Sequence, residues 1–139
     1  MRITYTEYKK IIAEGINSFP MFFAFNDNQF EEGKQKIGIS DNKELLSIGM
    51  GGYIRKADRE LFTNVLKKRK DSMKEFLKDN TNLKEAFYYE LNNHEYYITR
   101  DISDTLSALD LDYEELSIEQ KEILQQAINE YIIACNEVN

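Results

Sequence analysis

The sequence predicts a single α+β domain over residues 1–139, mainly helical, with a small two- or three-stranded antiparallel sheet that several helices cover. Three observations predict this fold. Apolar residues recur at helical spacing in several long stretches, two short apolar runs flank the glycine pair Gly51-Gly52, and only one proline interrupts the chain. A chain of this length buries roughly 65–70% of its unfolded surface, which is enough for one core.

The first three elements follow from local signals. Thr4 and Glu7 have the spacing of a capping box, so we expect a helix over residues 5–15. The aromatic run Met21–Phe25 lies between a proline and an asparagine-rich turn, which predicts a buried strand. Phe30–Ile37 is compatible with a short helix.

The middle of the chain combines a hairpin with helices. Residues 45–56 predict two strands joined at the glycine pair, because glycine supplies the positive φ that tight turns need. Apolar residues at helical spacing then predict a long helix over 57–78 and another over 83–96. The aromatic residues of 96–99 are also compatible with a strand, which is the alternative there.

Two further helices complete the expected fold. Residues 101–109 have the pattern of a short helix. Ser117 and Gln120 form a second capping-box pattern, which predicts a final helix over about 117–137.

Charge is segregated along the chain, whose net charge is −7. Residues 55–78 carry nine basic and four acidic residues, whereas residues 79–139 carry three basic and fourteen acidic ones. An acidic surface repels the phosphates of nucleic acids and membranes and attracts basic partners. The balance argues against direct binding to nucleic acid, although the basic run Lys67–Arg69 with Lys70 has the residue types that contact phosphates. That run has an alternative role, which is to pair with the acidic half of the chain.

The cellular compartment is inferred from cysteine and hydropathy. Cys135 is the single cysteine and cannot form an internal disulfide, and no apolar stretch approaches the ~20 residues of a membrane helix. We therefore expect a cytoplasmic protein with no membrane segment.

No catalytic, cofactor or metal motif is complete. Glu90 precedes His94 by one helical turn, an arrangement in which a carboxylate can orient an imidazole as a base. The spacing of Asp110, Asp112 and Glu114 copies the start of a calcium loop, but the glycine and the final glutamate of that loop are missing. We therefore expect no enzyme, no cofactor and no metal.

One alternative is a small enzyme or a ligand- or nucleotide-binding protein. Its pocket would combine the segment Gly49–Lys56 with Glu90 and His94, and would require these segments to meet in space. The pocket residues in this alternative are Gly51, Gly52, Arg55, Lys56 and His94.

Five segments together carry a resemblance to a known family: 16–20, 23–33, 51–58, 89–96 and 104–109. Over residues 5 to about 116 the chain resembles a family of small uncharacterised proteins encoded by bacterial phages, plasmids and conjugative elements. The final helix lies outside the recognised segments. The resemblance implies an accessory protein of a mobile genetic element, without catalytic residues to transfer.

Such accessory proteins often act on host defence or nucleic-acid-handling proteins, which carry basic grooves. We expect a protein-binding function in which acidic side chains dock on such a groove and inhibit its owner. The expected binding residues are Glu90, Glu95, Asp101, Asp104, Asp110, Asp112, Glu114 and Glu115. A second alternative is a homo-oligomeric regulatory subunit, such as a homodimer through the aromatic residues Phe87, Tyr88, Tyr89, Tyr96 and Tyr97.

Overall fold

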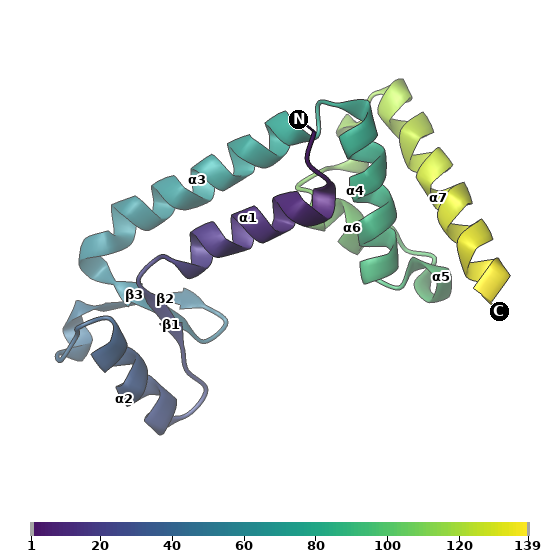
Figure 1. The fold of residues 1–139 in the computed structure, drawn as a ribbon. Helices are drawn as coiled ribbons and strands as arrows, with labels where there is room; N and C mark the ends of the chain where they lie inside the picture. Colours follow the sequence, from purple (N-terminus) through teal and green to yellow (C-terminus); the bar gives the residue numbers. More distant parts are fainter. Residues whose placement is uncertain (1, 139) are drawn as a thin grey trace. The chain divides into compact units, whose positions relative to one another are not determined.

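The computed structural model describes residues 2–138 and confirms the predicted fold class (Figure 1). The chain is mainly helical and contains one three-stranded antiparallel sheet. The contacts divide it into two compact units, a large one formed by Met1–Lys9 with Lys70–Asn139 and a small one formed by Lys10–Arg69. That the whole chain is a single domain stays a prediction.

Two helices, α1 (Tyr5–Asn17) and α3 (Arg59–Phe76), contribute residues to both units. The predicted capping box begins α1: the backbone N–H of Glu7 donates to Thr4 Oγ1 at 3.1 Å, and the N–H of Thr4 donates to Glu7 Oε1 at 3.2 Å. A short 3₁₀ turn, η2 (Lys56–Asp58), precedes α3. Both helices therefore lie where the sequence predicts them: α1 begins at the predicted residue and ends two residues later, and α3 is two residues shorter at each end.

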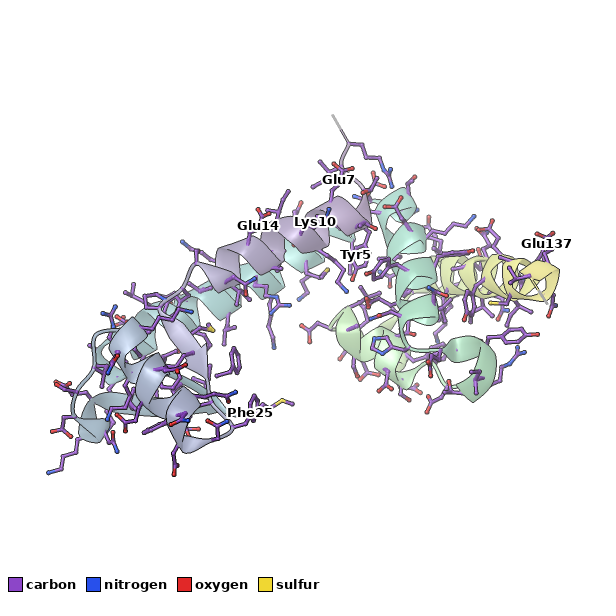
Figure 2. All side chains as sticks on the ribbon, turned by 60° about the horizontal axis from the view of Figure 1, so that its bottom comes forward. Tyr5, Glu7, Lys10, Glu14, Phe25 and Glu137 are labelled. Carbon is purple, nitrogen blue, oxygen red and sulfur yellow. The ribbon has the colours of Figure 1, made fainter. Side chains whose placement is uncertain are left out.

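The small unit contains the sheet, whose strand order is β1-β3-β2. The strands are β1 (Met21–Phe23), β2 (Leu45–Gly49) and β3 (Gly52–Arg55), and the helical segments between β1 and β2 are α2 (Asp27–Lys36) and η1 (Asn42–Glu44). The predicted hairpin joins β2 to β3, and β1 ends two residues before the predicted Phe25. Phe25 itself is 78% exposed and projects from the unit (Figure 2).

Aromatic stacking holds α2 on the sheet. Phe22 of β1 stacks on Tyr53 of β3 with ring centroids 5.3 Å apart, and Phe30 of α2 meets both rings edge-on. Gly33 faces Phe22, because a Cβ at this position would lie 2.1 Å from the phenyl ring. Phe22 and its buried neighbours Ile37 and Leu45 form the small core of this unit.

The large unit is a helix-on-helix assembly. Its elements beyond α3 are α4 (Asn80–Asn93), α5 (Tyr96–Thr99), α6 (Ser103–Ala108), η3 (Tyr113–Glu115) and α7 (Ile118–Val138). Its core includes Leu83, Phe87 and Leu91 of α4 together with Leu124 and Ala127 of α7. This larger core contains no strand, so the helices of the large unit pack on one another, and the sheet lies in the small unit. Burial of apolar helix faces against one another stabilises this part of the chain.

Residues 96–99 form the short helix α5, and the strand alternative is wrong for them. Tertiary contacts account for the difference, because Tyr97 donates from its hydroxyl to Asn136 Oδ1 at 2.8 Å and the Tyr96 ring packs against Tyr131 of α7. The preceding helix also differs from the predicted 83–96. It begins at Asn80, because the carboxylate of Asp79 accepts from the backbone N–H groups of Thr81 and Asn82.

Within residues 2–138, no helix is long and apolar enough to cross a bilayer. The final helix α7 is opened by its predicted capping box: the N–H of Gln120 donates to Ser117 Oγ at 3.0 Å, and the N–H of Ser117 donates to Gln120 Oε1 at 2.8 Å.

Candidate binding surface

Residues 101–115, which we call the acidic segment, carry six carboxylates and no basic residue. All six are exposed, and none takes part in an ion pair among the residues that the structure describes. They are Asp101, Asp104, Asp110, Asp112, Glu114 and Glu115. The segment therefore presents negative charge to solvent without a direct ion pair in the described part of the chain.

Local hydrogen bonds fix the backbone of the acidic segment. Asp101 Oδ1 accepts from the N–H of Ser103 at 2.8 Å at the start of α6, and Asp112 Oδ1 accepts from the N–H of Glu114 at 3.1 Å at the start of η3. Hydrogen bonds from the Ser103 side chain and backbone lower the pKa of Asp101. Asp110 has a φ of 56°, in the left-handed region that aspartate tolerates better than most residues. These carboxylates therefore order the segment as well as charge it.

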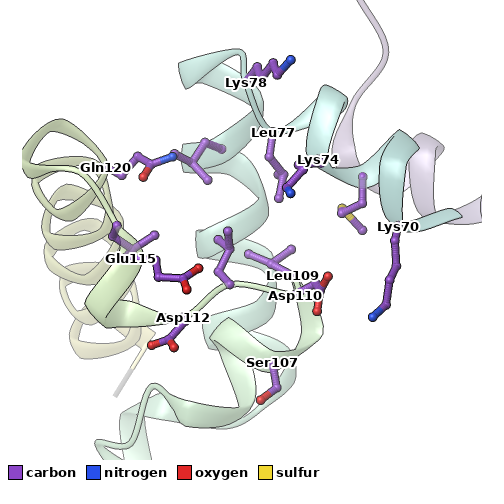
Figure 3. A pocket seen from close by; sticks show the side chains of 14 residues that line it. Lys70, Lys74, Leu77, Lys78, Ser107, Leu109, Asp110, Asp112, Glu115 and Gln120 are labelled. Atoms are coloured by element: carbon purple, nitrogen blue, oxygen red, sulfur yellow. The ribbon is translucent and has the colours of Figure 1, made fainter. Parts of the chain in front are cut away.

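A cleft of about 770 Å³ lies between the end of α3 and the acidic segment (Figure 3). Its floor is apolar and its two walls carry opposite charge. Lys70, Lys74 and Lys78 line it from the α3 side, and Asp110, Asp112 and Glu115 line it from the acidic segment. The cleft itself is thus balanced in charge, whereas Asp101, Asp104 and Glu114 lie outside its lining.

The buried carboxylate of Glu90 is not part of the acidic surface. The residue has no exposed area, and its Oε1 accepts from Lys9 Nζ at 2.7 Å. The hydroxyl of Tyr5 also hydrogen-bonds to Glu90, and burial together with the charge of Glu90 raises the pKa of Tyr5. Glu90 therefore belongs to an internal polar cluster instead of a docking face.

Glu90 and His94 lie near each other, and a joint site of the two stays a prediction. His94 Nε2 lies 3.7 Å from Glu90 Oε2, beyond hydrogen-bond distance, and the His94 side chain is partly buried. Glu95, the next predicted binding residue, is exposed and has a φ of 54°. It connects α4 to α5 and lies outside the acidic segment.

The residues of the alternative pocket belong to both units. Gly51, Gly52, Arg55 and Lys56 belong to the small unit and His94 to the large one. The Arg55 guanidinium donates from Nε to Asp58 Oδ2 at 2.7 Å, so it is already paired with a carboxylate of η2. Gly51, with φ 80°, provides the predicted hairpin turn. A ligand-binding role for this segment stays a prediction.

The basic run also has residues in both units. Lys67, Lys68 and Arg69 are exposed residues of the small unit, and Lys70 of the large unit lines the cleft together with Asp110. In the described part of the chain, no three histidine, cysteine, aspartate or glutamate side chains gather as metal ligands, so the calcium-loop spacing at Asp110 does not assemble a site.

Sequence reasoning missed Lys9 as the partner of Glu90. A signal was present, because Lys9 follows Tyr5 by one helical turn and so shares its face of α1. The aromatic residues proposed for a dimer divide in their burial: Phe87 is fully buried in the core, whereas Tyr88 and Tyr89 are each 37% exposed. The homodimer stays a prediction.

Comparison with known proteins gives a family but no activity. A family of unknown function, DUF7659, matches residues 4–134, so the match extends beyond residue 116 into α7. No curated protein and no solved structure matches the chain.

Proposed function

This chain belongs to DUF7659, a family of unknown function, and we propose from its surface that it is a non-enzymatic protein that binds a basic protein partner. We place it in the cytoplasm, as an accessory protein of a mobile genetic element, because of the segments that resemble proteins of phages, plasmids and conjugative elements. Its target is a host nucleic-acid-handling or defence protein, which it inhibits by occupying a basic groove.

The observation that carries the proposal is the acidic segment. Asp101, Asp104 and Glu114 are exposed, lie outside the charge-balanced cleft and make no ion pair among the described residues, so they create a local negative potential that attracts basic surfaces. A well-ordered backbone holds them, because Asp101 and Asp112 also accept local backbone hydrogen bonds. A preorganised charged surface loses less conformational entropy on binding than a flexible tail.

The cleft beside the segment supplies apolar contact area, which the charged side chains do not. Leu111 and Met73 line it and are partly buried, so they can still lose exposed area to an apolar side chain of a partner. We propose that the partner places basic groups over Asp101, Asp104 and Glu114 and an apolar group in the cleft. The lysines that line the cleft then lie at the edge of the contact with the partner. They repel any surface that is basic throughout.

The experiment is a pull-down from a host lysate with the wild-type chain and with the triple variant D104N/E114Q/E115Q, at low and at raised salt. The three side chains are exposed and make no hydrogen bond or ion pair that holds the fold. We expect a nucleic-acid-handling protein to bind the wild type at low salt, to dissociate as salt rises, and to be lost with the variant. The purified target should then bind its nucleic acid more weakly when the wild-type chain is added.

The matched control is E14Q/E32Q/E60Q, which removes the same charge from exposed side chains outside the acidic segment. If the control loses the partner as completely as the triple variant does, net charge and not the acidic segment determines binding, and the proposal fails. Recovery of no partner from the lysate also contradicts it.

A further inference from the structure

A second concave surface lies in the large unit, away from the acidic segment. It is a groove of about 980 Å³ along the exposed face of α4, lined on one side by residues at the start of α1 and on the other by α7. We call it the α4–α7 groove. None of residues 101–115 lines it.

The lining of this groove is negatively charged. Among the described residues, four carboxylates line it against one cation, Lys84, which is already bound to Glu130 Oε1 at 2.7 Å. Glu119 accepts from Asn80 Nδ2 at 2.6 Å, a neutral donor that does not compensate the carboxylate charge. Glu122 has no ion-pair partner among the described residues. Glu119 and Glu122 thus leave two uncompensated charges one helical turn apart on α7.

Aromatic faces lie beside these charges. Tyr88 and Tyr89 both line the groove and each is partly exposed. The faces of tyrosine rings attract ammonium and guanidinium groups. The chain uses this attraction itself, because Lys9 Nζ lies 4.8 Å from the centroid of Tyr89. The floor includes Ile123, which is 8% exposed, so an occupant meets only a small apolar area there in addition to the rings.

From this combination we propose that the α4–α7 groove is a docking site for a short basic segment of a protein partner. Carboxylates receive its lysine or arginine heads, and the tyrosine rings and Ile123 receive the apolar stems, the division of labour that these long side chains favour. The groove runs along α4 from Thr81 to Asn92, about 16 Å at the helical rise, which matches roughly five residues of extended chain.

Charge complementarity selects this occupant over the others. A nucleic acid or an acidic peptide meets repulsion from Glu119 and Glu122, and a purely apolar segment leaves these carboxylates desolvated without partners. The site is independent of the proposed function, because its residues and those of the acidic segment do not overlap.

The test uses a fluorescein-labelled hexapeptide of alternating arginine and alanine, with its glutamate–alanine counterpart, and measures fluorescence anisotropy. Three proteins are compared: wild type, the groove pair E119Q/E122Q and the segment pair D104N/E114Q. Both pairs remove two charges from exposed positions. We expect the groove pair to weaken binding of the arginine peptide at least tenfold, the segment pair to change it less than twofold, and the glutamate peptide not to bind.

A second pair of variants tests the aromatic contact. Tyr88→Phe keeps the ring and should keep the affinity, whereas Tyr88→Leu should weaken binding by about threefold, as expected for an exposed cation–π contact. Circular dichroism checks that each variant folds. If the groove pair and the segment pair lose affinity for the arginine peptide equally, long-range attraction alone explains binding and the docking site is refuted. A wild type that does not bind the arginine peptide would also refute it. The proposed function is tested by the pull-down with variants of the acidic segment, and the groove by peptide binding with variants of α7, so the two failures are distinguishable.

Discussion

Lys9 Nζ donates to Glu90 Oε1 at 2.7 Å, and this contact joins the first helix to the fourth through a carboxylate that has no exposed area. The ammonium group also lies over the rings of Tyr5 and Tyr89, at 5.5 and 4.8 Å from their centroids. A buried carboxylate without a cation is strongly unfavourable, so Lys9 is required for α1 to pack on α4 as it does.

Replacing Lys9 by methionine should therefore lower the free energy of unfolding by about 2–3 kcal/mol, because Glu90 then remains buried without its charged partner. The lysine side chain is 37% exposed, which places the expected loss below that of a fully buried pair. Urea unfolding followed by circular dichroism measures the change.

Lys10→Met is the matched control, since Lys10 is the next residue and is exposed. We expect it to change stability by less than about 0.5 kcal/mol. In the double variant K9M/E90L the uncompensated charge is gone, so stability should partly recover relative to K9M. Equal effects of the two lysine substitutions would refute the role of the buried pair.

Alkaline pH should weaken the same junction. Burial, and next the charge of Glu90, raise the pKa of Tyr5 above its usual value. Below about pH 10, the usual pKa, the hydroxyl is neutral in the folded and the unfolded chain. As pH rises further, the unfolded chain loses this proton first, so the free energy of unfolding falls.

The measurement is urea unfolding at several pH values between 8 and 11 for the wild type and for Tyr5→Phe. The variant starts from a lower stability, because it lacks the hydrogen bond to Glu90, but its stability should fall less steeply with pH. If both proteins show the same slope, the other tyrosines carry the alkaline sensitivity and Tyr5 does not.

The parts of the fold that sequence reasoning predicted are those with local causes. Both capping boxes, at Thr4 and at Ser117, need only residues three positions apart, and each forms with both of its hydrogen bonds. Residues 96–99 required knowledge of α7, because Tyr131 and Asn136 decide their conformation from more than thirty positions away. Local pattern does not contain that information.

In the candidate surface, too, sequence reasoning predicted the features with local causes and missed those that depend on distant contacts. The charge of residues 101–115 is visible in the sequence, and the exposure of all six carboxylates follows the ordinary preference of aspartate and glutamate. Glu90 broke this preference because Lys9, eighty-one positions away, compensates its burial. The groove along α4 arises from packing between distant helices, so no local motif marks it.

Removing a cap tests the local part of this explanation. Ser117→Ala deletes the hydroxyl that accepts from the N–H of Gln120, and should lower the free energy of unfolding by about 1 kcal/mol. Ser40→Ala, an exposed position outside any helix, is the control and should have almost no effect. Thermal unfolding of both variants measures the difference. If the two midpoints fall equally, the loss of any serine hydroxyl explains the effect and the cap at Ser117 does not.

Two helical glycines should respond in opposite directions to substitution by alanine. At Gly15 in α1 an added Cβ meets nothing within 4 Å, so Gly15→Ala should stabilise the chain by about 0.5–1 kcal/mol through helix propensity alone. At Gly33 in α2 the same methyl group would lie 2.1 Å from the buried ring of Phe22.

Gly33→Ala should therefore destabilise the small unit by about 1–3 kcal/mol, because overpacking against Phe22 outweighs the gain in propensity. The double variant G33A/F22L removes the ring that the methyl group meets, and should be less sensitive to the alanine than the wild type is. Urea unfolding of the four proteins measures the coupling between residues 22 and 33. Equal stabilisation by both single alanines would show that α2 does not pack on β1 through Gly33, since nothing then opposes the helix propensity of alanine.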